Sequence, residues 1–168
     1  MKIRNYAFFV VVILLFLSAG TDNAKLTEGF RPGNIAPEIK ISGTDDDIRF
    51  SDRSGYYTLL HFWAAYDAGS RMMNVKLWNK LKQDELSQVR ILSISMDKLE
   101  SVFSETVRVD KLETTNQLQE KLGEQSDLYL KYGLKKGLRN FLIDDDGVIL
   151  ATNVTPEKLS KIINKQGR

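Results

Sequence analysis

The chain has 168 residues, of which 42% are hydrophobic, and a formal net charge of +2. This length suits one domain with a buried core, and the nearly balanced charge gives no sign of a nucleic-acid-binding surface. The sequence contains no cysteine and a single histidine, His61. These counts exclude a disulfide scaffold, a cysteine nucleophile and a redox-active dithiol, and they argue against an ordinary zinc site. We expect neither a metal nor another cofactor.

Residues 1–20 have the pattern of a secretory signal peptide. Lys2 and Arg4 precede an apolar run from Ala7 to Leu17, and Ser18-Ala19-Gly20 supplies small residues for cleavage. The run is shorter than the roughly 20 residues that a membrane-spanning helix needs, although an uncleaved anchor stays open as an alternative. We therefore predict export to the periplasm or cell envelope.

The remainder is predicted to form one domain over residues 39–168, preceded by an extended lead-in over residues 21–38. Pro32, Gly33 and Pro37 discourage regular structure in the lead-in. Short strands are expected near 39–41 and 48–50. The aromatic-rich run from Tyr57 to Ala64 then predicts a buried central strand, and a helical pattern begins directly after Gly69.

The elements after this junction follow from periodicity and turn residues. Met73, Leu77 and Leu81 recur at four-residue spacing, which predicts a helix with one apolar face, and the adjacent Met72 is also expected in the core. The alternating segment 89–95 predicts a strand, and a short helix should contain Leu99, Val102 and Phe103. Within the polar segment 108–125, Leu118 and Leu122 favour a weak helix.

The C-terminal third has clearer signals. Ser126 is expected to cap a helix that ends at Gly133. Two apolar runs, 139–143 and 148–150, flank a turn that ends in Asp-Gly, which is typical of a β-hairpin. Thr155 should cap a last helix, with Pro156 in its first turn. Strand–helix–strand connections imply parallel pairing, so we predict an α/β fold with a mixed sheet and helices on both faces.

Four motifs give the chain a resemblance to extracytoplasmic thioredoxin-like proteins of the alkyl hydroperoxide reductase and cytochrome-maturation type. The motifs occur in the family's order and spacing, and the match extends over nearly all of residues 30–165. The resemblance implies a thioredoxin-like fold. The matching segments are Gly33-Asn34-Ile35-Ala36-Pro37, Ser51-Asp52 with His61-Phe62-Trp63-Ala64-Ala65-Tyr66, Tyr132-Gly133-Leu134, and Phe141-Leu142-Ile143-Asp144 through Gly147.

The chain departs from the family where the family does its chemistry. The C-x-x-C motif of the resemblance falls on Asp67-Ala68-Gly69-Ser70, and disulfide exchange needs one thiolate to attack and a second thiol to resolve the mixed disulfide. The family's cis-proline falls on Leu138, so the Gly137–Leu138 bond is expected to be trans. His61 falls near the buried carboxylate that many thioredoxins have.

Each of these positions has a structural and a functional interpretation. Asp67 and Ser70 are expected to cap the following helix, with the rim of a ligand or protein groove as the alternative. His61 is expected to be a hydrogen-bonded core histidine. Trp63 and Tyr66 are either core aromatics or an exposed edge for a partner. The candidate contact surface therefore comprises Trp63, Tyr66, Asp67, Ala68, Gly69, Ser70, Gly137 and Leu138.

The sequence thus favours a redox-inactive, non-enzymatic thioredoxin-like domain that binds or scaffolds a protein or peptide partner. No contact with nucleic acid is expected, and contact with a membrane only through an uncleaved N-terminal segment. Two alternatives stay open. One is a cysteine-free enzyme that acts on a glutathione-type thiol, with Ser70 or Tyr66 as the activating residue. The other is an accessory subunit of a thiol–disulfide redox system.

Overall fold

The computed structural model describes residues 26–43, 47–51, 55–83 and 86–166. The predicted signal peptide lies outside these residues. The main sheet has five strands in the order β5-β4-β3-β6-β7, and its bounds are β3 Tyr57–Trp63, β4 Val89–Ser95, β5 Gln117–Gln119, β6 Asn140–Ile143 and β7 Ile149–Thr152. β3 pairs parallel to β4 and antiparallel to β6, and β6 pairs antiparallel to β7. The sheet is therefore mixed, as predicted.

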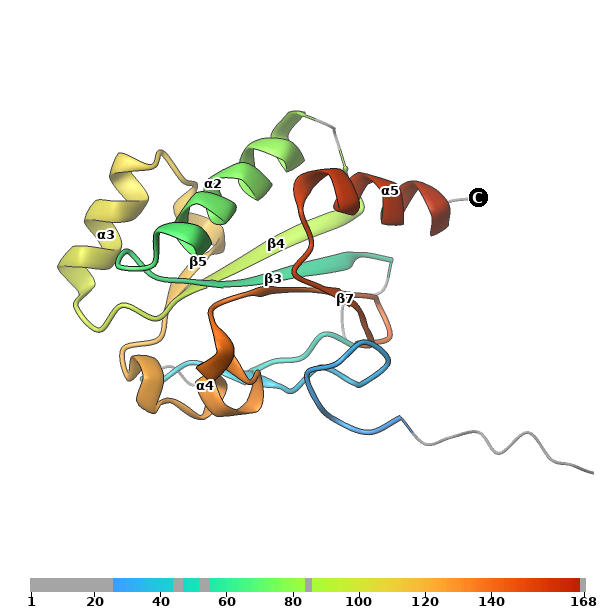
Figure 1. Cartoon of the computed structure of the whole chain (residues 1–168), viewed down its shortest axis with the longest axis horizontal. Helices are drawn as coiled ribbons and strands as arrows, with labels where there is room; N and C mark the ends of the chain where they lie inside the picture. Colours follow the sequence, from blue (N-terminus) through green and yellow to red (C-terminus); the bar gives the residue numbers. More distant parts are fainter. Residues whose placement is uncertain (1–25, 44–46, 52–54, 84–85, 167–168) are drawn as a thin grey trace, which may run out of the picture.

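Helices cover both faces of this sheet (Figure 1). α2 (Ala68–Gln83), α3 (Glu100–Val109) and α5 (Pro156–Gln166) lie on one face, and α4 (Asp127–Lys131) lies on the other. A small antiparallel ribbon of β1 (Ile39–Lys40) and β2 (Asp47–Ile48) joins α4 on its face. No helix within the described residues is long and apolar enough to cross a membrane.

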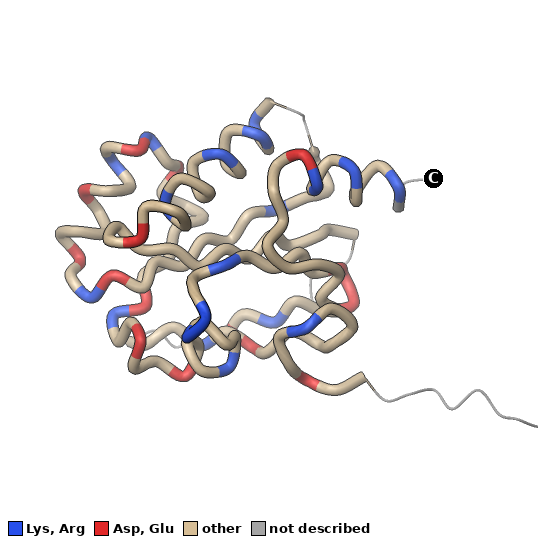
Figure 2. The backbone as a smooth tube through the Cα atoms, viewed as in Figure 1, with Lys and Arg blue, Asp and Glu red and all other residues tan. Residues whose placement is uncertain are grey.

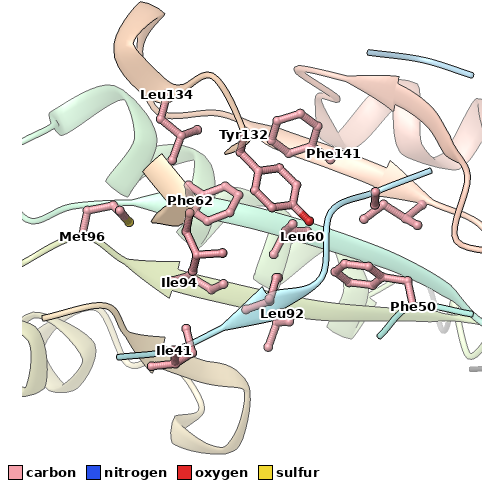
Figure 3. Close-up of a cluster of buried hydrophobic side chains, with 14 of the residues drawn as sticks. Ile41, Phe50, Leu60, Phe62, Leu92, Ile94, Met96, Tyr132, Leu134 and Phe141 are labelled. Atoms are coloured by element: carbon pink, nitrogen blue, oxygen red, sulfur yellow. The ribbon is translucent and has the colours of Figure 1, made fainter. Parts of the chain in front are cut away.

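The central strand divides the core in two because successive side chains point to opposite faces. Leu59 and Trp63 pack towards α2 and α5, together with Leu77 and Leu159. On the other face, Phe62 contacts the ring of Tyr132 at a centroid distance of 4.9 Å. Figure 3 shows this second cluster, in which the labelled aromatic and aliphatic side chains converge on the middle of the sheet.

Part of the lead-in is held against the domain by main-chain hydrogen bonds. The Gly33 N–H donates to the Ile149 carbonyl (2.8 Å), and the Ile149 N–H donates to the Asn34 carbonyl (2.9 Å). The hydroxyl of the buried Tyr132 donates to the Pro37 carbonyl (2.5 Å). The described part of the lead-in therefore runs beside β7 and over the α4 face.

Two sequence predictions are wrong. The segment around Leu118 forms the short strand β5 and not a helix, because it pairs with the end of β4 in the register Ser93↔Gln117 and Ser95↔Gln119. Met72 is 54% exposed and not part of the core, since it lies on the side of α2 away from the buried residues Asn74, Leu77 and Trp78.

Candidate functional site

The junction between β3 and α2, residues 64–70, carries most of the predicted site. Asp67 directly precedes α2, and its Oδ1 accepts the Ser70 N–H at 2.8 Å. Asp67 is thus the N-cap of the helix, as predicted. Ser70 is buried; its Oγ donates to the Asp67 carbonyl (3.2 Å) and accepts the Ala64 N–H (3.4 Å). Both side chains therefore satisfy main-chain groups of the junction itself.

A buried carboxylate from the next strand supports this junction. Asp97 follows β4, and its oxygens accept the Ala65 N–H at 2.9 and 3.1 Å. The Ser95 hydroxyl donates to the same carboxylate (2.7 Å). Asp97 is not among the residues predicted for the site. Its position as the first polar residue after the strand 89–95 was the available signal, since the carboxyl ends of neighbouring parallel strands meet at one edge of the sheet.

The structure separates Trp63 from Tyr66. The Trp63 side chain is fully buried against Phe103, with ring centroids 6.2 Å apart, whereas Tyr66 is 65% exposed. Partial burial raises the pKa of the Tyr66 hydroxyl, and the carboxylates of Glu124 and Asp97 raise it further. Tyr66 therefore presents a neutral, amphipathic ring to the solvent.

The remaining predicted residues lie around the same end of the sheet. Ala68 and Gly69 are exposed in the first turn of α2. The Phe62 N–H donates to the Arg139 carbonyl (3.0 Å), which places the 137–138 segment beside the end of β3. The Gly137–Leu138 bond is trans, as predicted, and Leu138 packs against the core while Gly137 is exposed. Trp63 and Ser70 are thus brought close to the surface residues but are themselves covered.

An open pocket of about 500 Å³ adjoins Tyr66. It lies between the β3–α2 junction and the start of α3, and its exposed apolar residues include Leu99 and Val102. Both side chains were predicted to lie in a helix, but neither was predicted to be part of the site. Within the described residues, no three histidine, aspartate or glutamate side chains are placed to hold a metal ion.

His61 belongs to a row of polar residues beneath α2. Its Nε2 lies 2.9 Å from the Ser70 carbonyl, so Nε2 carries the proton and Nδ1 has no partner among the described residues. Burial lowers the pKa of His61 from 6.5 to about 4, and its bond to Ser70 offsets part of that shift. His61 is therefore a neutral, buried histidine, as predicted.

The row crosses four strands at one level. His61 is in register with Asn140 on β6 and with Ser93 on β4, and Ser93 is in register with Gln117 on β5. Asn74 of α2 accepts from the Ser93 hydroxyl (2.7 Å) and donates to Gln117 (3.2 Å). These bonds attach α2 to the sheet directly beneath the junction.

Comparison with solved structures identifies the family. A thioredoxin-like protein from Parabacteroides distasonis is 51% identical to this chain, with a TM-score of 0.76, and the match covers 83% of this chain and 99% of that one. This chain belongs to the thioredoxin-like proteins. The thioredoxin domain of a thiol-disulfide oxidoreductase from Bacteroides vulgatus has the same fold at 22% identity, with a TM-score of 0.67 and coverage of 82% and 99% of the two chains.

A thiol-disulfide oxidoreductase from Bacteroides fragilis also shares the fold, at 22% identity and a TM-score of 0.61, over 79% of this chain and 99% of that one. Searches against protein-family models and against curated proteins gave no match. This thioredoxin-like protein has no cysteine anywhere in its sequence. Its β3–α2 junction is closed by a carboxylate and a hydroxyl.

Proposed function

We propose that this thioredoxin-like protein is a redox-inactive binding module that holds a protein or peptide partner outside the cytoplasm. The observation that carries the proposal is the absence of any sulfur nucleophile: the sequence has no cysteine, and Asp67 and Ser70 are engaged in capping α2. Disulfide exchange requires a thiolate, which neither side chain supplies. We infer that this fold acts through contacts at its surface.

The exposed surface around Tyr66 has the chemistry of a contact site. Tyr66, Leu99 and Val102 expose 65%, 65% and 38% of their surface beside one pocket. Tyrosine in such a setting supplies a large apolar area and a polar hydroxyl, and aromatic residues of this kind dominate binding energy at many interfaces. We refer to these three residues as the Tyr66 surface.

Export is supported by the sequence alone. The basic start, the apolar run from Ala7 to Leu17 and the small residues after it match a secretory signal peptide. We therefore place the binding function in the periplasm or cell envelope.

The geometry gives little support to a cysteine-free enzyme that acts on a glutathione-type thiol. Ser70 is buried and both of its hydrogen-bonding directions are occupied. Tyr66 is accessible, but the carboxylates of Asp97 and Glu124 lie close enough to raise its pKa. The same carboxylates would oppose a thiolate at that position. A thermal-shift titration with glutathione tests this alternative, because a bound ligand stabilises the folded state.

The test of the proposal combines activity with site-specific capture. The full chain should not accelerate reduction of insulin disulfides by dithiothreitol, and acceleration would overturn the proposal.

A photo-crosslinking amino acid introduced at Tyr66 should capture a partner from envelope extracts. The same group at Leu130, which is 56% exposed on α4, serves as the matched control. Equal capture at both positions, or none at Tyr66, would contradict binding at the Tyr66 surface. A captured thiol–disulfide oxidoreductase would assign the role of accessory subunit.

A further inference from the structure

One half of strand β4 has a neighbouring strand on one side only. All seven residues of β4 pair with β3, but β5 pairs only with the segment from Ser93 to Ser95. Within the described residues, no strand lies beside Val89–Leu92 on the β5 side. An unpaired strand edge offers main-chain donors and acceptors to another chain.

The hydrogen-bonding groups of Ile91 point to this open side. The Met96 N–H donates to the Trp63 carbonyl of β3 (2.8 Å), so the main-chain N–H and carbonyl groups of the even-numbered residues in β4 point to β3. The Ser95 carbonyl accepts the N–H of Glu120, just after β5 (2.8 Å), so the main-chain groups of the odd-numbered residues point to the β5 side. The N–H and carbonyl of Ile91 therefore face the edge where the sheet stops.

This open edge lies in a slot with apolar walls on both sides. The slot has a volume of about 650 Å³. Trp78 and Leu81 of α2 line it from one face of the sheet, and Ile48 of β2 and Leu118 of β5 line it from the other. Thr115 and Asn116, in the short 3-10 helix that precedes β5, line one end of the slot, so a guest strand would lie beside Val89–Ile91 and end where this turn begins.

The charge of the slot is basic. Lys82 and Arg90 line it, and no described aspartate or glutamate does. Lys82 lies over the Trp78 ring, 5.1 Å from its centroid, and the Arg90 guanidinium lies 3.7 Å from the centroid of the Tyr56 ring. Figure 2 shows further basic positions along the C-terminal half of α2. Stacking on aromatic rings holds the two cations at the rim of the slot.

We propose that the slot beside Val89–Leu92 binds an extended peptide segment of a partner protein that alternates apolar and acidic residues. Main-chain bonds to Ile91 would add the segment as a strand. Its apolar side chains, all on one face of that strand, would pack against Trp78 and Leu81, and its carboxylates, on the opposite face, would meet Arg90. A second copy of this chain fits less well, since pairing two of these edges would bring the Lys82 and Arg90 cations of both copies together. The slot lies at the opposite end of β4 from Asp97 and the Tyr66 surface.

The probe for the test is the blocked pentapeptide acetyl-Val-Glu-Val-Glu-Val-amide, added to the 15N-labelled full chain. We expect the peptide to shift the amide resonance of Ile91 and to slow the hydrogen exchange of that amide. Replacing both glutamates by lysines, or methylating the central peptide nitrogen, should weaken binding. The variant Arg90→Glu should weaken it by about threefold, because an attractive charge becomes repulsive.

The matched control is Lys158→Glu on α5, which changes the net charge equally and should bind the pentapeptide like the unmodified protein. An Ile91 amide that neither shifts nor gains protection at 5 mM peptide would overturn the proposal. So would equal binding of the glutamate and lysine peptides. Protection of the Ile91 amide that rises with protein concentration in the absence of peptide would show that a second copy occupies the edge, and would also overturn it.

Discussion

The charge of Asp67 matters because of where helix α2 begins. The first N–H groups of a helix lack partners within the helix, and the helix dipole places partial positive charge there. Cysteine thiolates gain stability from such a position, and so does a fixed carboxylate. Asp67 uses that field to bind the Ser70 N–H, which converts an end suited to a reactive group into a closed cap.

Replacement of Asp67 by alanine should therefore destabilise the fold. We expect Asp67→Ala to lower the free energy of unfolding by about 1 kcal/mol, because the Ser70 N–H loses its partner. Asp67→Asn is the matched control and should cost less, since the amide oxygen can still accept. Urea denaturation of the three proteins measures the difference, and equal stability of all three would show that the cap contributes nothing.

His61 predicts a particular dependence of stability on pH. Its pKa is lowered from 6.5 to about 4 by burial, so the unfolded chain takes up a proton that the folded chain does not. The stability linked to His61 is complete above pH 6.5 and falls as the pH drops towards 4. A shift of this size corresponds to about 3 kcal/mol.

His61→Gln removes this titration while it keeps a side-chain N–H for the Ser70 carbonyl. The difference in unfolding free energy between His61→Gln and the unmodified protein should move in favour of the variant as the pH is lowered from 7 to 4. Urea denaturation at four pH values provides the comparison. Two parallel stability curves would mean that His61 is protonated alike in both states.

Among the elements, those with strong local signals could be predicted from the sequence. The strand 89–95 has clear apolar alternation, and the helix after Ser126 has a cap and a terminal glycine; both form as predicted. β5 could not be predicted, because only three residues of polar sequence form it and its partner is a strand elsewhere in the chain. Pairing with β4 outweighed the local propensity of this segment for a helix.

The site shows the same division. The cap at Asp67 follows from local sequence, but the polar row of Asn140, His61, Ser93 and Gln117 depends on the register of four strands. Within its own strand, each of these residues is a single polar position with no motif around it. Only the sheet places them side by side, so local sequence singles out His61 alone.

Tyr132 joins α4 to the lead-in, and this connection can be tested. Its hydroxyl donates to the buried carbonyl of Pro37, and burial raises the pKa of that hydroxyl so that it keeps its proton. Tyr132→Phe should lower the unfolding free energy by about 1–3 kcal/mol, because the Pro37 carbonyl is left without a partner. Tyr129→Phe, at a half-exposed tyrosine of α4, is the control and should change stability by less than about 0.5 kcal/mol. Thermal or urea unfolding measures both variants.

Across the whole molecule, the β3–α2 junction is supported by contacts that involve no thiol. The central strand is buried on both faces, α2 begins at its end, and Asp97 holds the connecting turn in place. None of these features depends on a sulfur atom at position 67 or 70. The scaffold should therefore accept cysteines at these two positions.

We expect the double variant Asp67→Cys/Ser70→Cys to form an intramolecular disulfide in oxidising buffer and to gain weak insulin-disulfide reductase activity. The start of α2 would lower the pKa of the cysteine at 67, and a thiol at 70 would resolve the mixed disulfide. Activity should stay well below that of a thioredoxin, because the resemblance places the family's cis-proline at Leu138, and the bond before Leu138 is trans. Asp67→Cys alone is the control and should lack turnover, since its mixed disulfide has no resolving thiol. If mass spectrometry of the oxidised double variant showed two free thiols, the junction would have moved away from the geometry that thiol exchange needs, and the inference that only sulfur is missing would fail.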